Sequence, residues 1–242
     1  MQVPLAALTE PLRATLVGSD ATIERVITDS RLARPGDLFV PLVAERDGHD
    51  FIGAALAAGA TAALSERSAD NLGLDLAARL LLVAHTGAAL NDLAGFARAR
   101  MSGSVIGVTG SVGKTTVKDL MAGVLATKLV TSASERSFNN EIGVPLTLCN
   151  APDDVEALVV EMGARGPGHI AALCELAHPR VGVVTVVAGA HLELFGDLAG
   201  VAVAKGELIE ALPADGTAVL NADDPFVAAM AARSAAPVLT FG

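Results

Sequence analysis

The fold is decided by one stretch of the sequence, Gly107-Val-Thr-Gly110-Ser-Val-Gly113-Lys114-Thr115-Thr116. It follows an apolar run that predicts a strand, and it opens a segment with helical spacing. Glycines in such a turn let backbone amides approach phosphate oxygens, and the start of the helix adds a partial positive charge. The stretch therefore predicts a phosphate-binding loop between a strand and a helix. Its nucleotide-binding residues are expected to be Gly110, Ser111, Val112, Gly113, Lys114, Thr115 and Thr116.

Two side chains of this loop have the chemistry that nucleotide phosphates require. Lys114 can neutralise the β- and γ-phosphates, and the hydroxyl of Thr115 can bind Mg²⁺. The commonest form of the motif has a glycine at the position of Val108, whereas here glycines recur every third residue at 107, 110 and 113. A glycine-rich turn followed by a surface lysine is the alternative interpretation.

The residues after about 85 alternate short apolar runs with segments of helix length, which is typical of a parallel sheet with crossover helices. The expected strands are 105–109, 129–131, 157–161, 181–187, 217–220 and 238–241. The expected helices are 114–126, 167–177, 198–211 and 225–234. In such a sheet ligands bind beyond the carboxyl ends of the strands, so the residues just after each strand are candidates for a site.

The residues before 85 form a smaller pattern of the same kind. Its expected strands are 22–28, 37–43, 61–64 and 80–83, with a helix at about 50–58. A further helix at about 87–100 follows the boundary and leads to the glycine-rich strand and loop. We therefore predict an α/β protein with a small α/β domain over residues 1–85. A phosphate-loop domain with a mostly parallel sheet follows over residues 86–242.

The composition excludes several classes of protein. Hydrophobic residues make up 52% of the 242 residues and charged residues 18%, which excludes a disordered chain. No apolar run reaches the roughly 18–20 residues of a membrane span, and no signal peptide follows Met1, so we expect a cytoplasmic protein. The net charge of -10 argues against nucleic acid as a partner. Two cysteines are too few for a disulfide framework.

Segments from about residue 25 to 225 resemble one family. The spacing Gly-x-x-Gly-x-x-Gly-Lys-Thr-Thr is similar to the phosphate loop of the ATP-dependent Mur ligases of peptidoglycan synthesis and of the related folylpolyglutamate synthetases. Four more segments resemble the member that adds D-alanyl-D-alanine, namely 138–148, 161–164, 190–196 and 204–207. Near the N-terminus, Asp29-Ser30-Arg31, Pro35-Gly36-Asp37-Leu38-Phe39 and Asp47-Gly48-His49-Asp50-Phe51 resemble the UDP-binding domain of that member.

The resemblance implies an ATP-dependent amide ligase. It would join D-alanyl-D-alanine to UDP-N-acetylmuramoyl-tripeptide through an acyl phosphate, with ATP and Mg²⁺ as cofactors. The resemblance also implies an organisation in three domains, in which a C-terminal domain brings the amine. We expect that this chain stops inside the central domain. We therefore expect an N-terminal portion that is inactive alone, and its C-terminal half could be supplied as a separate chain.

The resemblance also implies the roles of individual residues. The implied catalytic residues are Lys114, His191 and Lys205. The implied metal-site residues are Thr115, Glu161, His191 and Lys205, with Lys205 carbamylated, because CO₂ adds to a neutral primary amine and gives an anion that can bind Mg²⁺. The implied substrate-binding residues are Ser30 and Arg31, for the uridine part, with Asn139 and Asn140.

The residues taken alone leave other roles open. The two asparagines could form a turn, and Glu161 could be a solvated strand end. His191 could be structural, and Lys205 could be an ordinary solvated lysine. The chain also departs from the family pattern in several places. Val186 and Ala188 replace an asparagine and a glycine, Arg136-Ser137 replaces Gly-Asn, and His169 replaces a glutamate.

Two other functions stay open from the sequence. One is the diamino-acid-adding Mur ligase, although the 138–148 segment favours the D-alanyl-D-alanine-adding member. The other is a nucleotide- and UDP-sugar-binding module without turnover, as a fragment or as half of a split ligase.

Overall fold

The strand before the glycine loop is β8 (Ser104–Thr109), and it lies inside a six-stranded sheet. The order of the strands is β13-β12-β11-β8-β10-β9, and all neighbours are parallel. Residues 105–109 are buried on both faces, as expected for a central parallel strand that reads as a continuous apolar run. The other strands are β9 (Thr131–Ala133), β10 (Ala157–Glu161), β11 (Val181–Val184), β12 (Thr217–Asn221) and β13 (Val238–Phe241).

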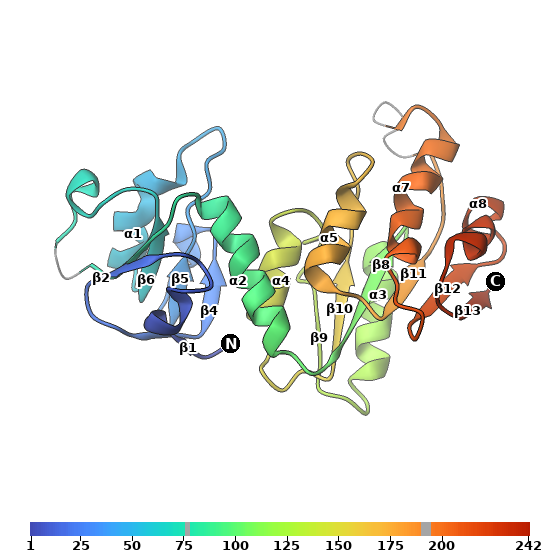
Figure 1. The fold of residues 1–242 in the computed structure, drawn as a ribbon, viewed down its shortest axis with the longest axis horizontal. Helices are drawn as coiled ribbons and strands as arrows, with labels where there is room; N and C mark the ends of the chain where they lie inside the picture. Colours follow the sequence, from blue (N-terminus) through green and yellow to red (C-terminus); the bar gives the residue numbers. More distant parts are fainter. Residues whose placement is uncertain (76–77, 190–194) are drawn as a thin grey trace. The chain divides into compact units, whose positions relative to one another are not determined.

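The computed structural model describes residues 1–75, 78–189 and 195–242 (Figure 1). They form two compact units, Met1–Arg100 with Leu148–Asp153, and Met101–Thr147 with Asp154–Gly242. Helix α2 (Thr86–Arg100), which the predicted boundary near residue 85 placed in the second domain, groups with the first unit. The division into domains 1–85 and 86–242 stays a prediction.

Helices cover both faces of the six-stranded sheet. The helices in this part of the chain are α3 (Lys114–Leu125), α4 (Gly143–Asn150), α5 (His169–Ala177), α7 (Leu198–Glu210) and α8 (Pro225–Ala228). Helix α3 packs on the face that carries Ile106 and Val108. On the opposite face α7 lies directly against the strand, because a Cβ added to Gly107 would come within 2.8 Å of Leu208. Helices α5 and α7 lie side by side (Figure 1).

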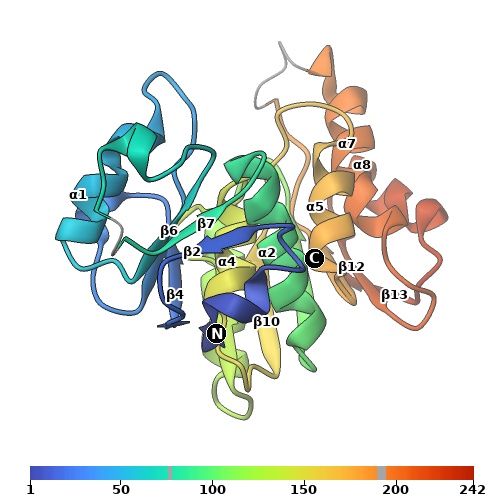
Figure 2. The same ribbon diagram turned by 60° about the vertical axis from the view of Figure 1, so that its left-hand side comes forward.

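The first unit contains a five-stranded sheet in the order β2-β7-β6-β5-β4 (Figure 2). Its strands are β2 (Thr15–Val17), β4 (Arg25–Ile27), β5 (Asp37–Phe39), β6 (Ala62–Ser65) and β7 (Leu80–Leu82). Strands β4 to β7 are parallel, and β2 is antiparallel to β7. A separate pair consists of β1 (Val3–Pro4) and β3 (Thr22–Ile23), and the α-helix that follows β5 is α1 (Ile52–Ala57). Short 3-10 helices span Leu5–Leu8, Ser30–Leu32, Gly48–Phe51, Asp70–Leu72 and Ala229–Arg233.

The predicted α/β fold with a mostly parallel sheet is confirmed, and several element ends differ. The strand expected over 181–187 ends at Val184, and from Val186 onward the backbone bonds to the glycine loop instead of to a strand. The strand expected over 22–28 is divided, since Thr22–Ile23 pairs with β1 and Arg25–Ile27 pairs with β5. Helix α4 was not predicted. Among the described residues, no helix is both long and apolar enough to cross a membrane.

Candidate functional site

The glycine loop connects the end of β8 at Thr109 to the start of α3 at Lys114. Gly110 and Gly113 have φ angles of +146° and +84°, which residues with a β-carbon rarely adopt. A Cβ at Gly110 would also lie 1.9 Å from the hydroxyl oxygen of Thr185. Both positions therefore require glycine, and the loop has the shape that the sequence predicts for a phosphate cradle.

Lys114 folds back over the loop. Its Nζ donates to the carbonyl oxygen of Gly110 at 2.9 Å and lies 3.5 Å from that of Ser111. The ammonium is thus held at the start of α3, where the helix dipole and the free backbone amides also favour negative charge. An anion bound in the loop would meet this ammonium directly.

The carboxylate of Glu161 is the most constrained acidic group of the site. Glu161 ends β10, opposite Val108 of β8, and is 1% exposed. Its Oε2 accepts a hydrogen bond from the hydroxyl of Thr115 at 2.8 Å, and its Oε1 accepts one from the side-chain amide of Asn139 at 2.8 Å. Both partners are neutral, whereas a buried carboxylate is costly unless a cation compensates it. The hydroxyl and the carboxylate are the hard oxygen donors that Mg²⁺ prefers, so these residues fit that ion.

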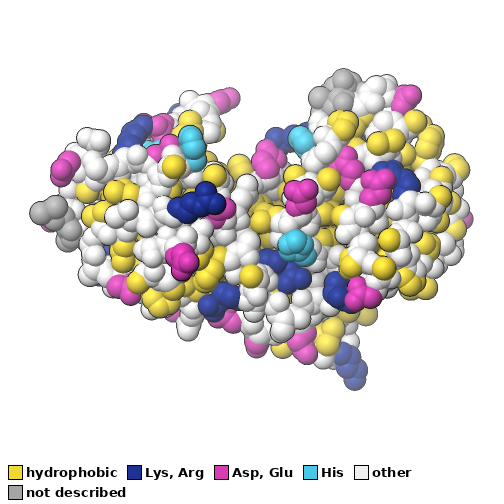
Figure 3. Space-filling model, in the orientation of Figure 1, with side chains coloured by type: hydrophobic (Ala, Val, Ile, Leu, Met, Phe, Trp, Pro, Cys, Tyr) yellow, Lys and Arg dark blue, Asp and Glu magenta, His cyan; other side chains and the backbone are white. Residues whose placement is uncertain are grey.

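The glycine loop forms one wall of an open pocket of about 460 Å³ within the second unit. Four of its lining side chains are basic or can become so, namely Lys114, Arg165, His169 and Lys205. The pocket also contains the apolar side chains of Leu173 and Phe195. This lining favours an anionic ligand that carries an apolar or planar part. On the face that Figure 3 shows, basic side chains are interspersed with acidic ones.

Lys205 is buried in this pocket rather than solvated. It lies on α7, is 6% exposed and lines the same cavity as Lys114. Burial, together with the positive charge of Lys114, lowers the pKa of Lys205 to about 8. The amine can therefore reach its neutral form far more readily than an ordinary lysine.

The neighbour of Lys205 in the same motif has a structural role. The carboxylate of Glu207 accepts hydrogen bonds from the amides of Gly168 at 2.6 Å and Ala171 at 3.0 Å. Glu207 thereby satisfies two amides at the N-terminus of α5 and ties α7 to it.

The two predicted asparagines do different work. Asn139 contacts Glu161, as described above. The side-chain oxygen of Asn140 accepts from the amides of Ile142 at 3.3 Å and Gly143 at 2.9 Å, and so caps the start of α4. Both asparagines line the pocket. The contacts of Asn140 agree with the alternative interpretation of these residues as part of a turn.

The segment after β11 is bonded to the glycine loop through its backbone. The amide of Ser111 donates to the carbonyl oxygen of Val186 at 2.7 Å, and the Ser111 hydroxyl is 2.9 Å from both the amide and the carbonyl oxygen of Ala188. These bonds do not depend on the side chains at 186 and 188, where the chain departs from the family pattern. His191 lies outside the described residues, so its predicted role stays a prediction.

Two residues that support the site carried no role in the sequence interpretation. Lys118 is buried on α3 and donates to two loop carbonyls. Asp224 accepts from the amide of Val187 at 2.6 Å and caps α8. The Asp-Pro pair at 224–225 is a helix-start signal that could have located the cap, but the bond to Val187 has no sequence signature.

The residues predicted to bind uridine lie in the first unit, just beyond the carboxyl end of β4. Ser30 opens a 3-10 helix. The side chain of Arg31 is 86% exposed, and its Nη2 lies 2.6 Å from the Oδ2 of Asp29. The guanidinium lowers the pKa of Asp29 by hydrogen bonding. The Arg31 side chain is therefore accessible to a ligand, and Ser30 is half-buried.

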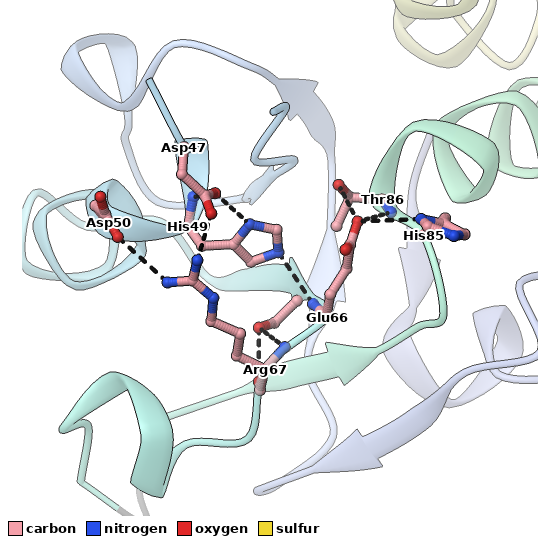
Figure 4. A network of polar contacts seen from close by, with 8 residues as sticks. Asp47, His49, Asp50, Glu66, Arg67, His85 and Thr86 are labelled. Atoms are coloured by element: carbon pink, nitrogen blue, oxygen red, sulfur yellow. Dashed lines mark hydrogen bonds and ion pairs between the residues drawn. The ribbon is translucent and has the colours of Figure 1, made fainter. Parts of the chain in front are cut away.

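A polar network fixes the loops that follow β5, β6 and β7 in the first unit (Figure 4). His49 is 2% exposed, with Nδ1 2.7 Å from Oδ1 of Asp47 and Nε2 accepting from the amide of Glu66 at 3.1 Å. The proton of the neutral ring is therefore on Nδ1. Arg67 also bonds Asp47, and the Glu66 carboxylate accepts from the amide and hydroxyl of Thr86 at 2.8 and 3.1 Å. The histidine of the Asp-Gly-His motif thus joins the loops after β5 and β6, and Glu66 joins the loop after β7 to them.

Comparison with known proteins agrees with this geometry. Residues 108–242 match the Mur ligase middle domain. The UDP-N-acetylmuramoyl-tripeptide--D-alanyl-D-alanine ligase of Escherichia coli K12 is 42% identical over 93% of this chain and 49% of its own length, and that of Bacillus subtilis is 38% identical over 91% and 49%. The chain spans about half the length of the curated relatives it matches.

The chain is also similar to solved structures of MurF. MurF from Acinetobacter baumannii is similar with a TM-score of 0.88 and 29% identity, over 100% of this chain and 54% of that one. MurF from Thermotoga maritima in complex with ADP gives a TM-score of 0.77 and 38% identity, over 90% of this chain and 50% of that one.

The loop geometry predicts opposite effects for two glycine substitutions. Gly110→Ala should destabilise the protein by about 1–3 kcal/mol, because it forces an unfavourable φ and a clash with Thr185. Gly123→Ala is the control, since Gly123 lies inside α3 with open space around it, and it should stabilise the protein by roughly 0.5–1 kcal/mol. Urea unfolding measures both, and equal stabilities for the two variants would contradict the described loop.

Proposed function

The chain belongs to the Mur ligase family, and on this premise we propose that it forms the UDP-precursor-binding and ATP-binding portions of a UDP-N-acetylmuramoyl-tripeptide--D-alanyl-D-alanine ligase. The observation that carries the proposal is the buried carboxylate of Glu161 against Thr115, one residue after Lys114 in the phosphate loop. This arrangement suits a nucleotide phosphate with its cation. The similarity to MurF in complex with ADP supports ATP as the nucleotide.

The proposed reaction is amide ligation. A carboxylate is a poor electrophile, so a carboxylate oxygen of the tripeptide first attacks the γ-phosphorus of ATP, and ADP leaves with the bonding electron pair. The amine of D-alanyl-D-alanine then attacks the carbonyl carbon of the acyl phosphate. The tetrahedral intermediate expels phosphate, and the nitrogen loses a proton. Catalysis of this kind depends on positioning the reactants and on neutralising phosphate charge.

The residues of this chain would divide that work. Lys114 would exchange its contacts with the loop carbonyls for the β- and γ-phosphates, and the free amides of the loop would bind phosphate oxygens. Mg²⁺, when bound, neutralises phosphate oxygens, and Thr115 and Glu161 would hold it. We also propose that His191 and a carbamylated Lys205 belong to the metal site. Asn139 would orient Glu161.

The substrate side of the proposal involves the first unit. Ser30 and Arg31 would contact the uridine part of the precursor, and Asn140 would contribute from the pocket. The relatives are about twice as long as this chain, so we propose that the amine-binding portion lies in the part that the chain does not cover. On this account the chain alone binds substrates without ligating them. A cytoplasmic location of the protein stays a prediction.

The first functional prediction concerns nucleotide affinity. Lys114→Ala should weaken ATP binding by about one to two kcal/mol, because it removes a charge-assisted contact. Lys128→Ala, which removes an exposed lysine just after α3, is the matched control and should leave the affinity unchanged. Isothermal titration calorimetry decides this. Equal affinities of wild type and Lys114→Ala would overturn the phosphate-loop assignment.

The second functional prediction separates binding from turnover. The 242-residue chain should bind the UDP-muramoyl tripeptide yet release no phosphate when ATP and D-alanyl-D-alanine are added, since proximity supplies roughly 7–11 kcal/mol to such reactions. Arg31→Ala should weaken precursor binding. Arg180→Ala, which disrupts a similar surface pair with Asp215, should not. Phosphate release at the rate of a complete ligase would contradict the account.

The third functional prediction concerns the carbamate. With a pKa of about 8, about a tenth of the Lys205 amine is neutral at pH 7, compared with less than about a thousandth at the ordinary lysine pKa. In a complete ligase with these residues, Lys205→Ala should abolish ligation, and short-chain carboxylates should partly restore it by replacing the carbamate. A fully active Lys205→Ala enzyme in the same steady-state assay would exclude the role.

A further inference from the structure

Lys118 is a buried lysine whose three ammonium protons can all be used within the protein. It lies on α3, one turn after Lys114, and its side chain is 3% exposed. Its Nζ donates to the carbonyl oxygens of Ser134 at 2.7 Å and Arg136 at 3.0 Å, and it is 2.9 Å from a carboxylate oxygen of Asp119. An ammonium has three donors and no acceptor, so these contacts satisfy it.

The two carbonyls belong to the loop that follows β9 and leads to Asn139. Arg136 has a φ of +48°, a left-handed conformation that residues with a β-carbon seldom adopt. The bond from Lys118 to its carbonyl oxygen holds the loop in this turn. A side chain of α3 is thus bonded to the backbone of this loop at two positions.

Both ends of this loop contact Glu161. At the first end the hydroxyl oxygen of Ser134 accepts from the Glu161 amide at 3.1 Å. At the other end the side-chain amide of Asn139 donates to the Glu161 carboxylate at 2.8 Å. Lys118 therefore bonds the backbone of Ser134, whose hydroxyl holds the Glu161 backbone, and that of Arg136, three residues before Asn139.

We propose that Lys118 is a positioning residue of the nucleotide and cation site, and that it aims Glu161 at Thr115 by fixing the 134–139 loop. The inference rests on the proposed function, because it assumes that Thr115 and Glu161 hold the cation of the nucleotide. Helix α3 then supplies both the residues that bind the nucleotide with its cation and the residue that positions Glu161. Its first turn supplies Lys114 and Thr115, and its second turn supplies the lysine that orders the facing loop.

Burial of the charge argues for this role over simple packing. Lysine is almost never fully buried unless it is paired, and desolvating its ammonium is unfavourable. A methionine would fill a similar volume without that cost. What the ammonium adds is the orientation of two carbonyl groups that both belong to the 134–139 loop.

The test measures how nucleotide binding depends on Mg²⁺. The 242-residue chain is titrated with ATP by calorimetry at increasing Mg²⁺ and in EDTA. Lys118→Met should raise the Mg²⁺ concentration for half-maximal effect about tenfold, as for other residues that orient metal ligands, and should change ATP affinity in EDTA less than about twofold. Lys118→Arg keeps the charge and the donors and should recover most of the Mg²⁺ response. Lys128→Met is the control with no expected effect.

A double-variant comparison separates positioning from stability. If Lys118 acts through the loop, adding Lys118→Met to Asn139→Ala should change the Mg²⁺ requirement little further. Thermal unfolding checks that the variants fold, and Lys118→Gln replaces the methionine variant if that one does not. An unchanged Mg²⁺ requirement, or equal losses with Mg²⁺ and in EDTA, would overturn the positioning role. A wild-type chain that binds no ATP would overturn the proposed function itself.

Discussion

The rest of the site depends on one buried carboxylate. Glu161 is 1% exposed and is held by a hydroxyl and an amide, neither of which carries charge. A negative charge in this position is costly unless a cation balances it, so the site is built for a ligand that brings one. The phosphate loop, whose anionic ligand would carry that cation, begins α3 directly beside it.

The fold supplies this arrangement through strand order and register. Strands β8 and β10 are parallel neighbours, and their pairing sets Glu161 opposite Val108, just before the glycine loop. Because parallel strands end at the same edge, both groups reach the same pocket. The bonds between Ser111 and residues 186–188, and the Lys118 contacts to the 134–139 loop, fix the two segments beside the glycine loop. In these two segments the bonds use backbone groups, so the side chains there can vary, whereas the support from α3 needs the side chain of Lys118.

Much of this could be predicted from the sequence, for physical reasons. Buried parallel strands read as continuous apolar runs, so the predicted ranges of β8 and β10 agree with the structure within a residue, and the glycine spacing locates the loop. Helix α4 was missed because Gly143 and Pro145 normally interrupt helices, whereas here Asn140 caps the start. The burial of Lys205 was missed because α7 is apolar on several faces, so the pattern does not show which face is covered. The contacts of Lys118 join residues 16 and 18 positions apart through backbone carbonyls, which leave no pattern.

The central claim is that Thr115 and Glu161 form a cation site beside the phosphate loop. The most direct test is anomalous diffraction from crystals of the chain grown with Mn²⁺ and a non-hydrolysable ATP analogue. The account predicts a manganese peak within bonding distance of the Thr115 hydroxyl and on the Glu161 side of the β- and γ-phosphates, with the hydrogen bond between the two residues replaced. Manganese bound only by phosphate and water, with that hydrogen bond intact, would contradict it.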